Sequence, residues 1–231
     1  MIRSLLTGAV VSALLAVSTV VGSPAVADPG GAGCTLSGAA DFFTPNGPGL
    51  QAAFGYSLTG TLTNCQSSRA GAPTDGTIDV GQVITAAVPI TLADGSVVQG
   101  TAKYQTPLAS GTGTVPANSC AAGSTAGDAL ITWSDGSTSV VDYTTSSAGA
   151  AVSLTGTVVD SLTATLVPGS ASPSGTAPAT HTVSSTSTAA PVGDGAQGVV
   201  AFTTDAPDGC TTDPGLTGVA VEGIVGVGST A

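Results

Sequence analysis

The stretch that decides the fold is residues 129–145, ALITWSDGSTSVVDYTT, in which Asp135-Gly136 separates two runs rich in β-branched and aromatic residues. Glycine supplies the positive φ angle that a two-residue type I′ turn requires. The pattern therefore predicts a hairpin that joins Ala129–Ser134 to Ser137–Thr145.

A two-residue turn fixes the register expected for this hairpin. The expected cross-strand pairs are Trp133–Thr138, Ile131–Val140 and Ala129–Asp142. One face then carries Ile131, Trp133 and Val140, while the other carries Leu130, Val141 and Tyr143. Because both faces are partly apolar, we expect the hairpin to lie in the centre of a closed or sandwiched sheet.

The same pattern extends along the chain. Asp94-Gly95 predicts a second two-residue hairpin, joining Val83–Ala93 to Ser96–Tyr104. Further strands are expected at Ala53–Asn64, Gly76–Val80, Gly111–Val115, Ala151–Val159, Leu162–Val167, Gly198–Thr204 and Leu216–Val227. No stretch has the pattern of a helix. We predict an all-β protein of about ten strands, either a single antiparallel barrel or a two-layer sandwich. The barrel is preferred because closure removes the exposed edges that a surface poor in lysine cannot protect.

The first 27 residues have the pattern of a secretory signal peptide, with Arg3 before an apolar run and small residues Ala25 and Ala27 before the expected cleavage site. Residues 28–231 are then one β domain, exported to the exterior or the cell envelope. Within it, residues 168–191 are rich in Ser, Thr, Ala and Pro. This segment predicts a long exposed loop with one weak edge strand near Thr180–Ser187.

The chain has four cysteines, all after the expected cleavage site. An even number in an exported chain predicts two disulfides, although four cysteines permit three connectivities. The pairing Cys34–Cys65 with Cys120–Cys210 is expected, because it closes one local and one long loop. A metal site is the weaker reading, because no CxxC spacing occurs and the single histidine is remote.

Charge excludes several classes of function. The chain has three Lys and Arg residues against fourteen Asp and Glu, for a net charge of −11. Nucleic-acid binding requires basic residues that neutralise phosphates, so no nucleic-acid partner is expected. Anionic membranes are disfavoured for the same reason. No transmembrane helix is expected beyond the signal segment.

Candidate chemistry is sparse. The only histidine, His181, lies in the low-complexity segment and reads as an exposed loop residue, which argues against a nucleophilic triad. Most of the aspartates lie in turns or beside glycine, and Asp142 and Asp160 are the better candidates for a special role, although a solvent-facing strand position is expected for both. Asp205, Asp208 and Asp213 form an acidic loop that is a weak candidate for Ca²⁺, although its spacing is not that of an EF-hand.

The aromatic residues are expected to pack in the core. Trp133 is expected in the core or at a barrel end. Phe42, Phe43, Phe54 and Tyr56 are expected to close one end of the sheet, with a shallow apolar site as the alternative.

Several blocks resemble a group of small secreted actinobacterial proteins to which no function is assigned. The most specific are residues 60–65 (GTLTNC), residues 131–139 (ITWSDGSTS) and residues 210–216 (CTTDPGL). This resemblance implies an exported, disulfide-bonded β-barrel or sandwich and supports the cysteine pairing. It implies no activity, cofactor or catalytic residue.

These observations predict a non-enzymatic secreted protein, either surface-associated or binding through its loops, with no cofactor. Its partner is not identified by the sequence. The alternatives are a lipocalin-like carrier of a small apolar ligand, an outer-membrane channel and a hydrolase.

Overall fold

The computed structural model describes residues 32–44, 47–48, 53–113, 122–148, 151–203 and 217–229. All the regular secondary structure in these ranges is β-strand, which confirms the all-β class. The described ranges contain no helix of the length and apolarity needed to cross a membrane. The expected signal peptide, residues 1–27, lies outside them.

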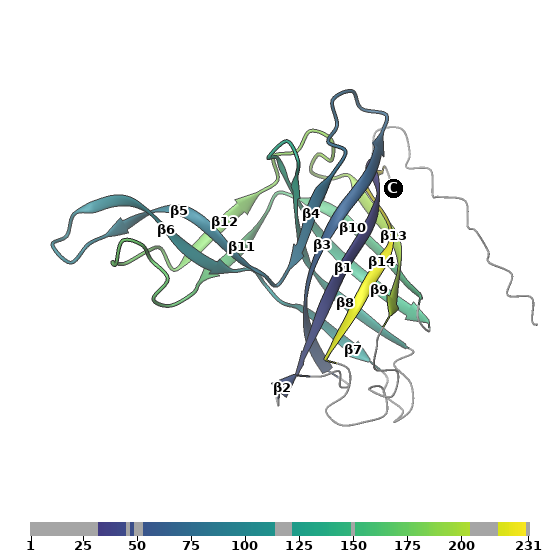
Figure 1. Cartoon of the computed structure of the whole chain (residues 1–231), viewed down its shortest axis with the longest axis horizontal. Helices are drawn as coiled ribbons and strands as arrows, with labels where there is room; N and C mark the ends of the chain where they lie inside the picture. Colours follow the sequence, from purple (N-terminus) through teal and green to yellow (C-terminus); the bar gives the residue numbers. More distant parts are fainter. Residues whose placement is uncertain are drawn as a thin grey trace, which may run out of the picture.

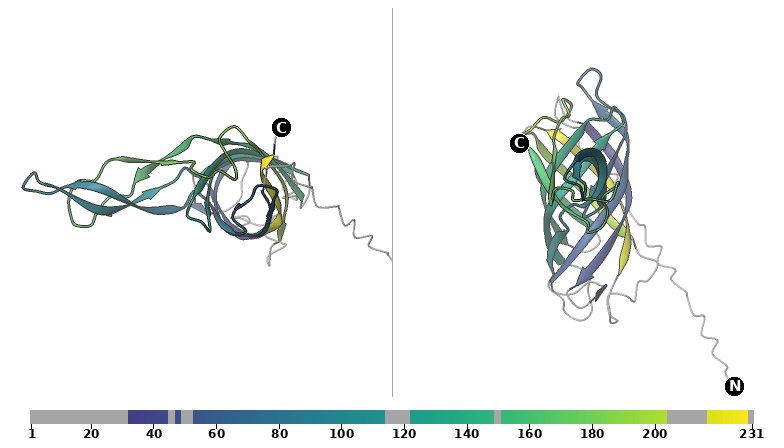
Figure 2. Two further views of the ribbon diagram at one scale, coloured as in Figure 1. Left: turned by 90° about the horizontal axis from the view of Figure 1, so that it is seen from above. Right: turned by 90° about the vertical axis from the view of Figure 1, so that its left-hand side faces the viewer.

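A closed antiparallel barrel with eight strand positions forms the body of the molecule (Figures 1 and 2). Its strands are β1 (Ala32–Thr44), β3 (Ala53–Ser67), β4 (Gly76–Val80), β7 (Ala109–Gly113), β8 (Ala122–Trp133), β9 (Thr138–Ala148), β10 (Ala151–Val159), β13 (Gly195–Thr203) and β14 (Gly218–Ser229). The order is β1-β14-β13-β10-β9-β8-β4-β3, and pairing between β1 and β3 closes the ring. The short β2 (Gly47–Pro48) pairs with the end of β1.

One position in the barrel is shared by two strands. Both β4 and β7 lie between β3 and β8, where β4 pairs with residues 58–62 of β3 and β7 pairs with residues 53–56. The chain therefore leaves the barrel after Val80 and re-enters the same position at Ala109.

The excursion builds a second sheet. It contributes β5 (Val83–Thr91) and β6 (Val97–Gln105), while the connection from β10 to β13 contributes β11 (Ser161–Leu166) and β12 (Thr180–Ser184). These strands form a four-stranded sheet in the order β12-β11-β6-β5. We call residues 81–108 and 161–186 the arm, because they project sideways from the barrel (Figures 1 and 2). The barrel alternative is thus correct, but the separate second sheet is not predicted by the sequence.

Both expected hairpins exist, but their turns differ from the prediction. Trp133 N donates to Ser137 O, and Gly136 N donates to Trp133 O. In each turn the glycine has a positive φ, 85° at Gly95 and 82° at Gly136, and the aspartate before it does not. A type I′ turn needs positive φ at both central residues, so these are three-residue loops with the glycine in a bulge.

The extra loop residue shifts the register by one and reverses part of the predicted facing. Ile131 pairs with Ser139, and Leu130 pairs with Val140. The lumen of the barrel receives Ile131, Trp133, Val141 and Tyr143, whereas Leu130 and Val140 face outward and pack under the arm. The predicted faces were wrong, although the expectation that both sides of the hairpin are covered is correct.

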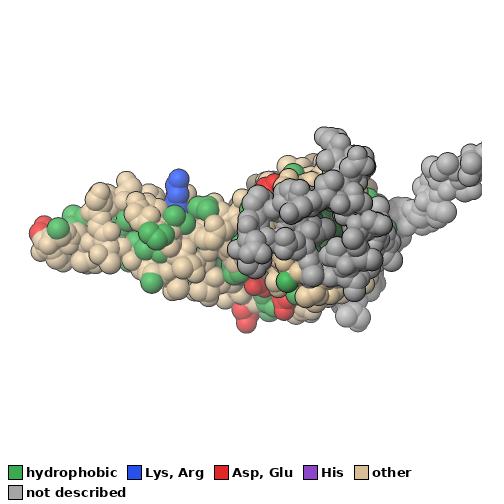
Figure 3. Space-filling view, turned by 90° about the horizontal axis from the view of Figure 1, so that it is seen from below, with side chains coloured by type: hydrophobic (Ala, Val, Ile, Leu, Met, Phe, Trp, Pro, Cys, Tyr) green, Lys and Arg blue, Asp and Glu red, His purple; other side chains and the backbone are tan. Residues whose placement is uncertain are grey.

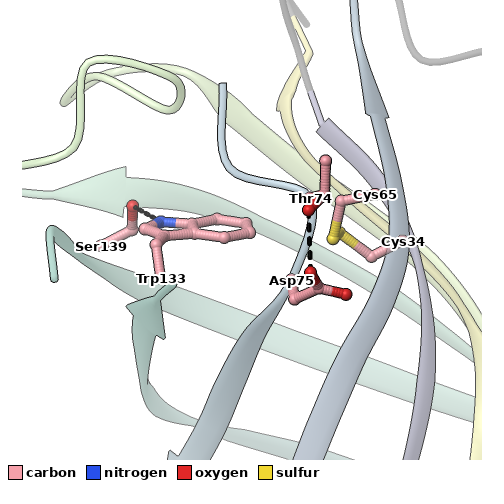
Figure 4. Close-up of a disulfide and its surroundings, with 6 residues drawn as sticks. All are labelled: Cys34, Cys65, Thr74, Asp75, Trp133 and Ser139. Carbon is pink, nitrogen blue, oxygen red and sulfur yellow. Dashed lines mark hydrogen bonds between the residues drawn. A yellow bond between two sulfur atoms is a disulfide. The ribbon is translucent and has the colours of Figure 1, made fainter. Parts of the chain in front are cut away.

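The upper lumen is filled by apolar side chains, including Leu36, Leu62, Ile78, Ile131 and Trp133. Trp133 is 2% exposed, and its Nε1 donates to Ser139 Oγ at 2.9 Å, which satisfies its polar atom inside the core. Cys34 and Cys65 form the predicted disulfide between β1 and β3, beside Thr74 and Asp75 (Figure 4). Cys120 and Cys210 lie outside the described residues.

Some elements carry no clear sequence signal. Strand β1 was not predicted, because Gly, Ala and Ser make up much of its first ten residues. By contrast, strand β12 confirms the weak edge strand expected near Thr180–Ser187, because it spans Thr180–Ser184 and lies at the edge of the second sheet.

Candidate functional site

The arm is fixed to the barrel at two places, and the first is its base. Gln82 N donates to Thr106 Oγ1 at 2.8 Å, and Thr106 N and Oγ1 both donate to Gln82 O at 3.0 Å. Gln105 Nε2 also donates to Gly81 O at 2.6 Å. Thr106 is 1% exposed. These bonds join the two segments, residues 81–82 and 105–106, by which the chain leaves the barrel and returns to it.

The second attachment joins the end of β12 to β9 of the barrel. Thr138 Oγ1 donates to Ser184 O at 2.7 Å, and Val140 N donates to Ser185 Oγ at 2.8 Å. Ser185 Oγ in turn donates to Val159 O at 2.6 Å, so one hydroxyl links the arm to two barrel strands. Two independent attachments hold the arm in one orientation.

An apolar core lies beneath the inner face of the arm and continues onto the barrel wall. It includes Ile90, Tyr104 and Leu162 from the arm together with Leu130 and Val140 from the barrel. Tyr104 is fully buried, and its hydroxyl donates to Pro178 O at 3.2 Å. Because the arm and barrel share this core, the arm is part of the folded body.

The opposite face of the β5–β6 hairpin is exposed. We call it the outer face and define it by the exposed residues Val83, Thr85, Ala87, Pro89, Thr91, Val97, Gln99, Thr101 and Lys103. Val97 is 63% exposed and Val83 is 50% exposed, which places them among the most exposed large apolar residues described. The outer face is therefore a twisted sheet surface of Val, Ala, Pro, Thr and Gln with one ammonium group.

Charge separates the arm from the barrel. Asp94 at the hairpin tip is the arm's one acidic residue, and Lys103 is its one basic residue. Every other acidic residue of the chain lies outside the arm. Figure 3 shows this contrast, with a single basic side chain standing out from the arm and acidic side chains gathered where the arm meets the barrel.

The two basic residues that follow the predicted signal peptide have different roles. Arg69 is used structurally, because its guanidinium donates to Thr188 O and Ala189 O and pairs with Asp194. Lys103 is exposed on the outer face, and among the described residues its side chain has no ion-pair partner. Lys103 is therefore a basic group on the outer face that makes no ion pair within the described part of the chain.

A second candidate site lies in the lower lumen. The hydroxyls of Tyr56 and Tyr143 are in hydrogen-bond contact, and Tyr56 also contacts Thr125 Oγ1 at 3.2 Å. Thr125 Oγ1 lies 2.7 Å from Thr145 Oγ1, which completes a hydroxyl cluster of four residues. Burial raises the pKa of both tyrosines, so these hydroxyls are neutral donors and acceptors.

Apolar rings surround the hydroxyl cluster. Phe42 and Phe54 pack edge to face with ring centroids 5.7 Å apart, and Tyr56 lies beside both. Three side chains at this level, Phe54, Leu154 and Phe202, are only partly buried. The expected aromatic group is therefore real, except that Phe43 faces outward and is 39% exposed.

An acidic pair lies on the outer wall of the barrel. Asp128 of β8 pairs directly with Asp142 of β9. Along the two strands, this is the next outward-facing pair after Leu130–Val140, which the arm covers. Burial, and then the nearby Asp142 carboxylate, raise the pKa of Asp128. Within the described residues, no group of three or more His, Cys, Asp or Glu side chains is arranged to hold a metal ion.

The other predicted site residues are not brought together. Asp142 is exposed on the wall, as expected, and Asp160 is exposed at the bend between β10 and β11. His181 is not an exposed loop residue. It is half-buried on β12, and its ring centroid lies 5.2 Å from that of Tyr104. The acidic loop with Asp205, Asp208 and Asp213 lies outside the described residues.

A shallow pocket of about 330 Å³ lies in the arm between Leu166 and the loop of residues 169–177. Its lining consists of Leu, Ala, Gly, Ser and Thr without an ionisable group. It therefore offers no group for acid–base chemistry.

Neither the family models, nor the curated proteins, nor the solved structures yield a match to this chain.

Proposed function

We propose that the protein is a secreted, non-enzymatic binding protein in which the barrel supports the arm and the outer face contacts a partner on the cell surface. The observation that carries the proposal is the exposure of Val83, Val97 and Lys103 on one face of the projecting arm, where Lys103 is the single charged residue. The predicted signal peptide and the Cys34–Cys65 disulfide support placement outside the cytoplasm.

The composition of the outer face sets the kind of partner. Apolar residues and hydroxyls fit a partner surface of low charge, and Lys103 favours one acidic group within it. The barrel, which carries most of the acidic residues, would be repelled by the same acidic group. Contact through the arm therefore keeps the acidic body away from the partner.

Equilibrium binding of the labelled, purified full-length protein to intact cells of the organism that encodes it tests this proposal. Burial of one valine side chain contributes roughly 1.5–3 kcal/mol, so Val97→Asp should weaken binding by about tenfold or more. Val199→Asp is the matched control, because Val199 is 60% exposed on β13 of the barrel. Absence of saturable binding by the wild type, or equal binding by both variants, would contradict the proposal.

A carrier of a small apolar ligand is the second candidate function. Its support is the lower lumen, where partly buried Phe54, Leu154 and Phe202 lie near the hydroxyl cluster. A site with apolar walls and a few polar groups is typical of small-molecule binding. Solvent extraction of protein purified from its own organism should release a stoichiometric apolar molecule if this function is correct.

The channel alternative has less support. Membrane-spanning barrels carry apolar residues on their outer wall and polar residues inside. Here the described outer wall carries Thr35, Ser37, Asp41, Thr59 and Glu222 as exposed residues, whereas the upper lumen is filled by apolar side chains.

A further inference from the structure

The loop between β11 and β12 has an unusual composition. Residues 168–179 read PGSASPSGTAPA, with no charged, aromatic or large apolar residue. Segments rich in Ser and Thr with interspersed Pro are typical acceptors of O-linked sugars, because their extended backbone and exposed hydroxyls are accessible to a transferase.

The loop is held in place on the β5–β6 hairpin. Ser172 N donates to Thr101 O, and Thr101 N donates to Ser172 O, both at 2.8 Å. Thr176 exchanges the same pair of bonds with Thr91, at 2.8 and 2.9 Å. Between these two bridges the chain spans Pro173 to Gly175 without a backbone hydrogen bond to the described residues.

Three hydroxyl residues in this stretch point to solvent. Ser172, Ser174 and Thr176 are exposed, and their hydroxyls make no hydrogen bond to the described residues. Ser170 differs, because its hydroxyl accepts from Lys103 N at 3.0 Å and donates to Lys103 O at 3.2 Å. The loop thus presents, within five residues, three exposed hydroxyls without a hydrogen-bond partner among the described residues, each next to a proline, a glycine or both. Ser174 and Thr176 lie at the open pocket beside Leu166.

We infer that Ser172, Ser174 and Thr176 are acceptor sites for O-linked glycosylation. In this transfer, the hydroxyl oxygen forms a bond to the anomeric carbon of a sugar activated as its phosphate ester. The bond from that carbon to the phosphate oxygen breaks, the phosphate leaves as an anion, and the hydroxyl proton passes to a base of the transferase. The modification adds no charge.

The position of the loop makes such a modification compatible with binding by the arm. The loop lies over the inner side of the hairpin, where a Cβ on Gly175 would meet Ile90. Val83, Val97 and Lys103 lie on the opposite side. A sugar on the loop would hydrate the weakly charged arm and leave the outer face free. The inference goes beyond the proposed binding function and does not depend on it.

A protein kinase is the alternative source of modification at a hydroxyl. The loop contains no acidic or basic residue that a kinase could recognise by its charge. Lys103, whose backbone contacts the loop, carries its side chain on the opposite side of the sheet. Neutral sugar transfer is therefore the chemistry that fits this segment.

Intact-mass measurement of the full-length protein purified from the organism that encodes it tests the inference. We expect one to three hexose-sized additions, as an estimate from three acceptor hydroxyls, and fragmentation should place them within residues 172–176. Replacement of Ser172, Ser174 and Thr176 by Ala should remove them. A matched triple replacement of the exposed strand residues Thr157, Thr163 and Thr182 by Ala, none of which belongs to the outer face, should leave them unchanged.

An unmodified mass, a phosphate-sized addition, or sugars located only outside residues 172–176 would overturn the inference. Thermal unfolding of both triple variants establishes that they are folded. Binding to cells is measured separately, so failure of glycosylation and failure of the proposed binding function are distinguishable.

Discussion

Arg69 and Asp194 lie 125 residues apart in the chain, and Arg69 Nη2 is 3.2 Å from Asp194 Oδ2. The same guanidinium donates to Thr188 O and Ala189 O, both at 2.9 Å. The segment it binds places Ala190, which is fully buried, in the barrel core. A single arginine therefore ties the β3–β4 connection to the segment that returns from the arm.

Replacement of this arginine tests its structural role. Hydrogen bonds to a charged donor contribute about 1.5–3 kcal/mol each when buried, and partial exposure reduces this, so we expect Arg69→Ala to cost about 1–2 kcal/mol. Such a loss lowers the melting temperature by roughly 2–8 °C in a domain of this size. Circular dichroism measures the shift. Lys103→Ala is the control and should leave the melting temperature unchanged, because the Lys103 side chain is exposed and unpaired within the described residues.

The Asp128–Asp142 pair predicts a pH dependence. The raised pKa of Asp128 means that the folded state holds the proton to higher pH than the unfolded chain does. The resulting loss of stability is absent at low pH and appears as pH rises through the folded pKa. Asp128→Asn should therefore stabilise the protein at pH 7 by a few tenths to about 1 kcal/mol.

The stabilisation by Asp128→Asn should disappear near pH 3.5, below the ordinary pKa of an aspartate of about 3.9. Urea unfolding at both pH values measures it. Asp41→Asn, at an exposed position on β1, is the comparison. An equal effect of Asp128→Asn at both pH values would show that its charge is not the cause.

The turn at Gly136 gives a third prediction. Gly136 has a φ of 82°, and a Cβ there would meet no atom within 4 Å, so any cost of Gly136→Ala comes from the backbone. The expected loss is about 1–2 kcal/mol. Gly226→Ala serves as control, because its φ is not in the left-handed region and the nearest atoms to a Cβ are 3.8 Å away. Equal losses at the two glycines would argue against the bulged turn.

The disulfide gives a fourth prediction. Cys34 and Cys65 close a loop with a sequence separation of 31, for which the loop-entropy model predicts a stabilisation of about 3–4 kcal/mol. The Cys34→Ala, Cys65→Ala double variant should unfold at a correspondingly lower urea concentration. An unchanged midpoint would mean that the bond does not constrain the unfolded chain.

The two hairpins show where sequence reasoning succeeded and where it failed. Asp-Gly correctly located both turns, but the side chain of the aspartate changes the turn type. Asp135 Oδ1 accepts from Ser137 N and Ser137 Oγ, and Asp94 Oδ1 accepts from Ser96 N and Ser96 Oγ. These bonds hold the aspartate at negative φ, and the serine after the glycine is the signal that would have predicted the one-residue shift.

Local sequence patterns did not predict the arm as a separate sheet, for a different reason. Strands β5, β6 and β11 were each predicted, yet their separation from the barrel depends on β4 and β7 sharing one position, which is a relation between residues 76–80 and 109–113. The outward-facing apolar residues Leu130 and Val140 were the available clue, but the incorrect register placed them on opposite faces. In sequence, the outer face appears only as every second residue of two strands, mostly Thr, Val and Ala, a pattern that many strands share.

Site-specific photo-crosslinking of cell-bound protein tests the central claim, that the outer face is the contact surface, most directly. A crosslinker replaces Gln99 on the outer face in one variant and Ala201 on the barrel wall in another, both exposed positions in strands. The account predicts that the Gln99 variant forms a covalent adduct with a component of the cell surface and that the Ala201 variant does not. An adduct from Ala201 without one from Gln99 would contradict it.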